Sequence, residues 1–181
     1  MTAARGSRRP AVVSRRPRLA QGKAPSTTAA EAIDDIRRLE RGLRLMARAV
    51  EAATGISAAQ LFVLEIVGRQ PAASLAELSA QTLTDRSSVS VVIERLAARR
   101  LVRRQVSAAD ARRIEVHITP AGRRLLAKAP TPPTVRLLTA VAAMPAPARC
   151  RLANELRRLN QALGFASDLP HLLFEDPPRG R

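Results

Sequence analysis

The chain has 181 residues, 46% of them hydrophobic, and a formal net charge of +16. That length and composition support one sizeable core, so we expect about one domain with extensions, and the charge indicates a polyanionic partner. No apolar run approaches the roughly 18 residues of a membrane span, and the basic N-terminus lacks the apolar stretch of a secretory signal, so we expect a cytoplasmic protein with no membrane partner.

The first 28 residues combine Pro, Gly, Ser and Thr with seven basic residues and no acidic residue. Because they show no hydrophobic periodicity, we expect a disordered basic arm over residues 1–28. Two roles remain open for it. The arm is either a leader without function or a segment that adds sequence-independent attraction to phosphates.

A long helix is predicted from Glu31 to Ala53. Two rows of apolar residues recur every seven positions within it, namely Ile36, Leu43 and Val50 in one row and Leu39 and Met46 in the other. This spacing is typical of a short coiled-coil seam. The seam either packs against the chain's own domain or receives a partner helix.

Two further helices are predicted by their start signals. Two pairs of residues have the spacing of a capping box, namely Ser57 with Gln60 and Ser74 with Glu77. In a capping box, each side chain accepts a hydrogen bond from the backbone N–H of the other residue. Thr54 and Gly55 end the preceding helix. The expected inward residues of the two new helices are Leu61, Leu64 and Val67, and then Leu75 and Leu78.

A third helix follows the turn at Thr82–Asp85. Its expected buried residues have the spacing i, i+3, i+4 and i+7, and they are Val89, Val92, Ile93 and Leu96. The opposite face carries mostly small or polar side chains, namely Ser87, Ser90, Val91, Glu94 and Ala98. Small outward residues leave room for close approach by a partner.

A basic hairpin is predicted after this helix. Ile114, Val116 and Ile118 alternate with polar residues, as in a half-buried strand, and pair with the segment that follows Leu101. Between Arg95 and Arg113 the chain has seven arginines against one acidic residue. Thr119 and Pro120 then provide an N-cap and a first-turn proline for another helix.

These elements define a mainly α fold with a small β-hairpin wing. Residues 57–122 form a winged helix-turn-helix, whose last helix is presented to the major groove of DNA. Alanine- and leucine-rich helices near Val135–Met144 and Pro147–Leu163 suit a dimer interface. The domain is therefore expected to extend over residues 29–164 with N- and C-terminal dimerisation helices, followed by a tail at 165–181.

The segment from Ser57 to Leu126 resembles the MarR family of bacterial transcription regulators. The resemblance rests on five short motifs in order, at residues 87–90, 93–96, 101–104, 110–112 and 118–122. It implies a homodimer built from the first and the C-terminal helices, with two DNA-reading modules. In many members it also implies a site that senses a small molecule or oxidation.

Two positions depart from the family pattern. Arg100 stands where a glycine usually separates the recognition helix from the wing, so the helix end must become left-handed at some cost or be remodelled. Val91 replaces a long polar residue. Valine can contact a thymine methyl group but cannot make a bidentate base contact.

The candidate DNA-binding residues are Arg86, Ser87, Ser90, Val91, Glu94, Arg95, Arg103, Arg104, Arg112 and Arg113. Arg112 resembles the wing arginine that enters the minor groove, and Asp110 would orient its guanidinium. Both Arg112 and Arg113 could instead be solvated loop charges. Glu94 either accepts a hydrogen bond from a cytosine amino group or pairs with Arg95 or Arg99.

Catalysis, metal binding and cofactors have no support in the sequence. The two histidines, His117 and His171, lie in different predicted elements, and the single Cys150 has no histidine near it. Cys150 lies between two arginines and is a candidate oxidation sensor, but a small helix residue is the simpler interpretation. We therefore expect a protein that is not an enzyme.

Three functions remain. The first is a dimeric, sequence-specific DNA-binding regulator, most simply a repressor, whose partners are double-stranded DNA, a second copy and an effector of unknown identity. The second is a basic nucleoid or RNA-binding protein with mostly electrostatic binding. The third is a winged-helix interaction module that no longer reads DNA.

Overall fold

The computed structural model describes residues 27–70, 73–107, 110, 112–165 and 172–174. The chain divides into two compact units, Met1–Ile36 and Arg37–Arg181. Of the predicted basic arm, all but the last two residues lie outside the described residues, as does most of the predicted tail, including His171. The domain boundaries at residues 28 and 164 therefore stay predictions.

The first helix, α1, extends over Thr27–Thr54 and ends where Gly55 adopts a φ of +70°. Its apolar seam changes character along its length. Val50 is 1% exposed and belongs to the core, whereas Ile36 and Leu39 are 46% and 53% exposed. The C-terminal end of the seam thus packs on the chain's own domain, and the preceding turns keep an exposed apolar stripe.

Helices α2 (Ala58–Arg69) and α3 (Leu75–Thr82) both begin with the predicted capping boxes. Gln60 N–H donates to Ser57 Oγ at 3.2 Å, and Ser57 N–H donates to Gln60 Oε1 at 3.3 Å. Leu61, Leu64 and Val67 are buried as predicted, but the burial of α2 extends over nearly all of its length. Helix α2 is therefore the central element of the core.

Helix α4 (Arg86–Ala98) is capped by the carboxylate of Asp85, which accepts a hydrogen bond from Ser88 N–H at 2.8 Å. The four residues predicted to face inward are at most 1% exposed. The helix ends at Arg100, whose φ is +56°, and Leu101 N–H then donates to the carbonyl of Leu96 at 3.0 Å. The left-handed alternative anticipated at Arg100 is confirmed.

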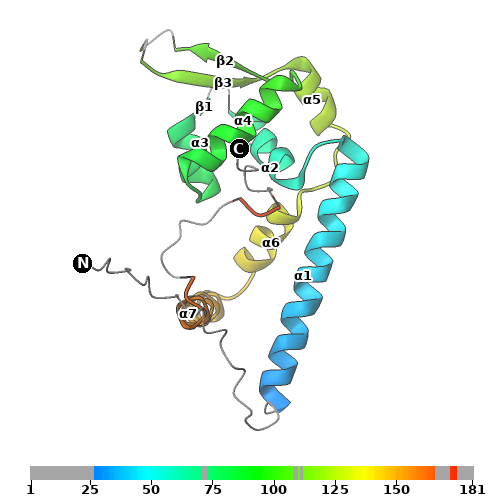
Figure 1. Cartoon of the computed structure of the whole chain (residues 1–181), viewed down its shortest axis with the longest axis vertical. Helices are drawn as coiled ribbons and strands as arrows, with labels where there is room; N and C mark the ends of the chain where they lie inside the picture. Colours follow the sequence, from blue (N-terminus) through cyan, green and yellow to red (C-terminus); the bar gives the residue numbers. More distant parts are fainter. Residues whose placement is uncertain (1–26, 71–72, 108–109, 111, 166–171, 175–181) are drawn as a thin grey trace, which may run out of the picture. The chain divides into compact units, whose positions relative to one another are not determined.

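The wing is a hairpin of β2 (Val102–Val106) and β3 (Ile114–Ile118), with Val102 opposite Ile118. A third strand, β1 (Ala73–Ser74), pairs with the other edge of β3, so the antiparallel order is β1-β3-β2 (Figure 1). The sequence did not predict β1, because two residues carry no alternating pattern.

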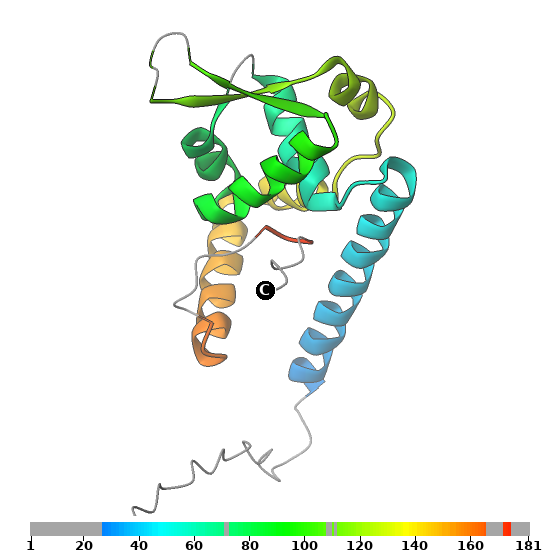
Figure 2. The ribbon, with the colours of Figure 1, turned by 45° about the horizontal axis from the view of Figure 1, so that its top comes forward.

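Of the three residues predicted to face inward on β3, Ile114 is exposed instead of buried. Val116 and Ile118 are 0% and 5% exposed, but Ile114 is 40% exposed. Ile114 pairs with Val106, itself 57% exposed, at the distal end of the hairpin, which extends past the helices (Figure 2). The alternation of side chains persists there, but this end of the strand is only partly covered.

Three helices complete the chain: α5 (Pro120–Leu126), α6 (Pro133–Ala142) and α7 (Ala146–Ala162). Thr119 caps α5 as predicted, because its Oγ1 accepts from Gly122 N–H at 3.0 Å. Helix α7 has no buried residue and exposes Leu156, Leu159 and, just after its end, Leu163. From the tail, Leu172 joins the core at 5% exposure.

Among the described residues, no single helix is long and apolar enough to cross a membrane. Residues Thr28–Thr54 and Ala58–Arg69, bent by 69° at their junction, pass that test on length and composition only when taken as a pair.

Candidate nucleic-acid interface

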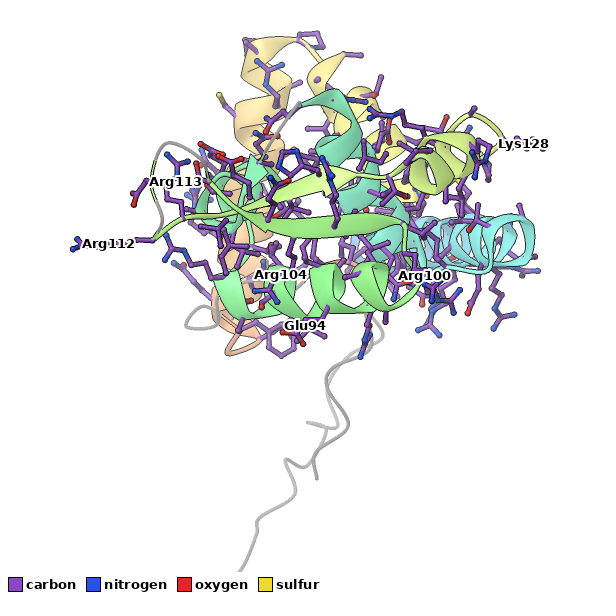
Figure 3. The ribbon with its side chains drawn as sticks, turned by 90° about the horizontal axis from the view of Figure 1, so that it is seen from above. Glu94, Arg100, Arg104, Arg112, Arg113 and Lys128 are labelled. Carbon is purple, nitrogen blue, oxygen red and sulfur yellow. The ribbon has the colours of Figure 1, made fainter. Side chains whose placement is uncertain are left out.

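Helix α4 presents a polar face away from the core. Its apolar face packs on α2 and α3, while Arg86, Ser87 and Glu94 are exposed and Ser90 and Val91 are half-buried. Figure 3 shows Glu94 on this outer face, with Arg100 at the helix end. The fifth residue that the sequence predicted on the outer face, Ala98, is also exposed, so none of these five residues is buried in the core.

The N-terminus of α4 is held by a dense set of hydrogen bonds to Asp85. Its carboxylate accepts from Ser88 N–H at 2.8 Å and from Ser88 Oγ at 2.6 Å, and also from the hydroxyl of Ser87. Because the Ser87 proton is engaged within the chain, that side chain is left to act as a hydrogen-bond acceptor. The first turn is fixed in place before any partner arrives.

The C-terminus of α4 is tied to the turn before α2. The guanidinium of Arg99 donates to the carbonyl of Gly55, which ends α1. Arg99 therefore has a structural partner in this turn. Arg100 is exposed and Arg95 is half-buried. The cluster of arginines at this end of the helix is not a uniform cationic patch.

The two strand arginines lie on opposite faces of the hairpin. Arg103 pairs with His117 and Arg104 pairs with Val116 in the register of β2 and β3. Cross-strand partners share a face and consecutive residues alternate, so only Arg104 lies on the same face as the buried Val116. A rigid partner approaching one face of the wing meets one of these arginines, and the structure does not bring the pair together.

The tip of the wing is shaped by hydrogen bonds to Asp110. Asp110 Oδ1 accepts from the backbone N–H of Arg112 at 2.9 Å, and the Asp110 carbonyl accepts from Arg113 N–H at 2.9 Å. Asp110 thus shapes the turn that carries Arg112, and its orientation of the Arg112 guanidinium stays a prediction. Arg112 extends outward from this turn (Figure 3).

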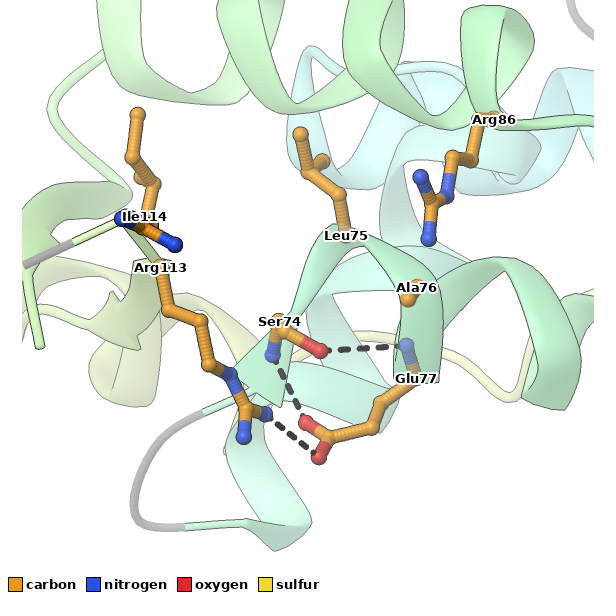
Figure 4. Close-up of a pocket in the computed structure, with 8 residues that line it drawn as sticks. Ser74, Leu75, Ala76, Glu77, Arg86, Arg113 and Ile114 are labelled. Atoms are coloured by element: carbon orange, nitrogen blue, oxygen red, sulfur yellow. Dashed lines mark hydrogen bonds and ion pairs between the residues drawn. The ribbon is translucent and has the colours of Figure 1, made fainter. Parts of the chain in front are cut away.

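A groove of about 520 Å³ lies between the wing, the start of α3 and the start of α4 (Figure 4). It is lined by Ser74, Leu75, Ala76, Glu77, Arg86, Arg112, Arg113 and Ile114. Three guanidinium groups and one carboxylate therefore border a partly apolar floor. Such a groove attracts an anionic chain that also has apolar surface.

The carboxylate in this groove pairs with one of the three arginines. Glu77 Oε1 accepts from Arg113 Nη2 at 3.0 Å, and the two side chains are 49% and 52% exposed. The other oxygen, Oε2, accepts from Ser74 N–H at 2.8 Å within the capping box. Sequence reasoning identified Glu77 only as a capping residue, because its ionic partner lies 36 positions away.

The hydrogen bonds of the capping box lower the pKa of Glu77. The largest cause is the backbone N–H of Ser74, followed by the Ser74 side chain, and the Arg113 guanidinium adds to the effect. All three stabilise the charged carboxylate more than they stabilise the acid. Glu77 therefore stays ionised, and stays a partner for Arg113, throughout the neutral range.

Comparisons with known proteins agree with this geometry. Residues 54–113 match a family model described as MarR family. No curated protein matches the chain. A solved structure concerning BpsR of Bordetella bronchiseptica, whose DNA binding is regulated by 6-hydroxynicotinic acid, is 26% identical, with a TM-score of 0.52 over 76% of this chain and 98% of that one.

Two Streptomyces coelicolor structures have the same fold. Sco3205, a MarR family transcriptional regulator in complex with DNA, is 19% identical, with a TM-score of 0.55 over 82% of this chain and 99% of its own. PcaV, in complex with its natural ligand, is 20% identical, with a TM-score of 0.53 over 78% and 99%. Together with the family match, which covers residues 54–113, these findings show that the chain has the winged helix-turn-helix fold and is similar to MarR family proteins over that segment.

Proposed function

We propose that this chain is a homodimeric, sequence-specific DNA-binding repressor. Helix α4 enters the major groove, and the wing reaches the adjacent minor groove. The observation that carries the proposal is the placement of the exposed polar face of α4 beside a basic hairpin, within one compact unit. This arrangement matches the docking geometry of helix-turn-helix proteins.

We assign base-edge or flanking phosphate contacts to the outer face of α4, and phosphate or minor-groove contacts to the wing and the helix end. The assigned residues are Arg86, Ser87, Ser90, Val91, Glu94, Arg95, Arg103, Arg104 and Arg112. Among the wing residues, Arg112 is the best placed for a narrow minor groove, since its turn is preformed by Asp110. The guanidinium of Arg113, the remaining candidate of the wing, is already engaged by Glu77.

The dimer part of the proposal rests on apolar side chains that the chain leaves exposed. Ile36 and Leu39 on α1, with Leu156 and Leu159 on α7, are between 42% and 53% exposed. Contiguous apolar stripes of this kind favour association with a second copy. A two-fold dimer of this domain would read a near-palindromic site with half-sites about 10 base pairs apart.

We also propose that an effector modulates binding by shifting the separation of the two α4 helices. The support comes from similar proteins, since PcaV is solved with its natural ligand and DNA binding by BpsR is regulated by a small molecule. Cys150, which is exposed on α7, is a second candidate sensor. Thermal-shift screening of aromatic acids, and of the oxidised protein, tests both candidates.

Titration of DNA duplexes tests the central proposal. The probes are palindromic segments from the chain's own upstream region and a random duplex of equal length, each at several salt concentrations. A specific regulator should prefer one palindrome by about 10³-fold or more, and its binding should weaken as salt rises. Equal affinity for all duplexes would overturn the claim of sequence specificity.

One observation favours a second function. Val91 is half-buried, and its neighbours on the outer face of α4 are mostly serines, so this face has few groups for bidentate base readout. A basic protein that binds DNA or RNA mostly through phosphates is therefore the alternative. It would bind random duplex as tightly as any palindrome, and binding to no duplex at low salt would instead favour an interaction module.

A further inference from the structure

The groove between α3, α4 and the wing lies where a DNA strand must pass if the proposed function holds. The major groove holds α4 and the flanking minor groove holds the wing, and one sugar-phosphate backbone separates these two grooves. Arg86 is the first residue of α4, and Arg112 lies at the tip of the wing. They line the same groove of about 520 Å³, so the strand would meet both walls at once.

The groove contains three arginines, but one of them is neutralised within the chain. Glu77 joins Arg113 through a 3.0 Å contact while its second oxygen is held by Ser74 N–H (Figure 4). The carboxylate is thus anchored to the start of α3 and cannot follow Arg113 outward. A phosphate that recruits Arg113 must first displace it from this fixed partner.

We propose that Glu77 is a positioning residue that withholds Arg113 from DNA phosphates and keeps it as a bridge between α3 and the wing. Arg86 and Arg112 then contact the strand in the groove, and Arg113 does not. Since the pair is about half exposed, its contribution to folding stability is small. Its main consequence is therefore the number of cations that the groove presents to a partner.

Salt titration counts these cations, because each phosphate contact changes the slope of log K against log salt by about 0.9. The E77Q variant removes the charge and keeps the capping box, since glutamine already fills this role at Gln60 in the box of α2. With random duplex as the probe, we expect E77Q to show a slope steeper than that of wild type by about 0.9. Between about 50 and about 200 mM salt, E77Q should lose about 3.5-fold more affinity than wild type does.

Two matched variants locate the effect at Arg113. R113A should keep the wild-type slope, and the double variant E77Q/R113A should match R113A, because no released arginine remains. R112A should instead flatten the slope by about 0.9. R113A leaves both partners of the α3 capping box in place, so it tests the inference even if E77Q folds poorly.

The inference rests on the proposed DNA binding, but the two fail in different ways. If wild type binds no duplex at low salt, the proposed function is wrong. If wild type binds with a clear salt dependence, yet R113A flattens the slope and E77Q leaves it unchanged, then Arg113 contacts a phosphate and only the role of Glu77 is wrong.

Discussion

The hydroxyl of Thr119 donates a hydrogen bond to the carbonyl of Arg100 at 2.8 Å, and so connects the end of α4 to the start of α5. The same oxygen accepts from Gly122 N–H at 3.0 Å as the cap of α5. Arg100 itself has a φ of +56°, where a side chain is strained. Thr119 thus holds the junction between α4 and the wing, in which Arg100 has a strained backbone conformation.

Replacing Arg100 with glycine should relieve this strain. We expect R100G to raise the free energy of unfolding by about 0.5–1 kcal/mol, because glycine has no Cβ to clash in the left-handed region. Urea unfolding measures the change. R99G is the matched control, because it removes the same charge. Arg99 has an unstrained φ of −85° and donates a hydrogen bond to the Gly55 carbonyl, so R99G should lower the free energy of unfolding. If R100G were no more stable than R99G, the assignment of strain would be wrong.

A second strained residue lies in the turn between α3 and α4. Leu83 has a φ of +55° and is 74% exposed, so its side chain gains little from burial. The turn is held independently of it, because Ser79 Oγ donates to the Thr84 carbonyl at 2.6 Å. We expect L83G to be more stable than L83A by about 0.5–1 kcal/mol, since alanine keeps the Cβ and glycine removes it. Equal stability of L83G and L83A in urea unfolding would contradict the expectation.

Gly122 allows close packing between α5 and the start of the wing. A Cβ on this residue would lie 2.3 Å from the Leu101 carbonyl oxygen and 2.8 Å from Ile118 Cγ1. Because the first of these atoms belongs to the backbone, relief requires α5 to shift. We expect G122A to lower the free energy of unfolding by about 2 kcal/mol or more.

Gly42 is the matched control for this substitution. It lies within α1, and a Cβ there would meet nothing within 4 Å. G42A should therefore raise stability by about 0.5–1 kcal/mol through helix propensity alone. If G122A lost no more stability than G42A changes in either direction, the close approach of Gly122 to the Leu101 carbonyl would not limit the packing of α5.

Local signals in the sequence predict most of this fold. The two capping boxes and the Thr119 cap each join residues three positions apart, and the apolar residues of α4 recur every three or four positions. All of these features form as predicted. The elements that were missed depend on tertiary register. Strand β1 forms only because β3 offers an edge, and Ile114 stays 40% exposed because it lines the open groove beside the start of α3.

The candidate site also has some features that the sequence predicts and others that depend on tertiary structure. The outer face of α4 follows from helical periodicity, and the charge of the wing follows from composition. The pairing of Glu77 with Arg113 does not follow from the sequence. Glu77 was already explained as a capping residue and Arg113 as a basic residue of the wing, so neither required a distant partner. Opposite charges on predicted neighbouring elements were the available signal, but only the register of β3 beside α3 selects this pair.

The lowered pKa of Glu77 predicts a particular dependence of stability on pH. A carboxyl group whose pKa is lowered by folding stabilises the native state above its unfolded pKa, and that stabilisation is lost as the pH falls through the folded pKa. The ordinary pKa of this group is 4.5. Wild type should therefore be more stable than E77Q near neutral pH, and the difference should shrink as the pH falls below 4.5.

Urea unfolding of both proteins between about pH 3 and about pH 7 measures this difference. R113A provides the comparison, because it keeps the Ser74 hydrogen bonds that are the largest cause of the shift. R113A should retain most of the acid-dependent loss that E77Q lacks. A difference between wild type and E77Q that stays constant over this range would mean that folding does not lower the pKa of Glu77.

The proposed dimer can be tested on α7, where substitution disturbs little within the chain. Leu159 is 42% exposed and the helix buries no residue of its own, so its apolar side chains have few contacts to lose. We expect L159E to sediment as a monomer with unchanged helix content, because a carboxylate buried between subunits is unpaired. Affinity for a palindromic duplex should then fall by about 10²-fold, since each half-site is bound alone. N160E places the same charge one residue further along the exposed helix and should remain a dimer. If L159E and wild type sediment identically at micromolar concentration, α7 does not form the interface.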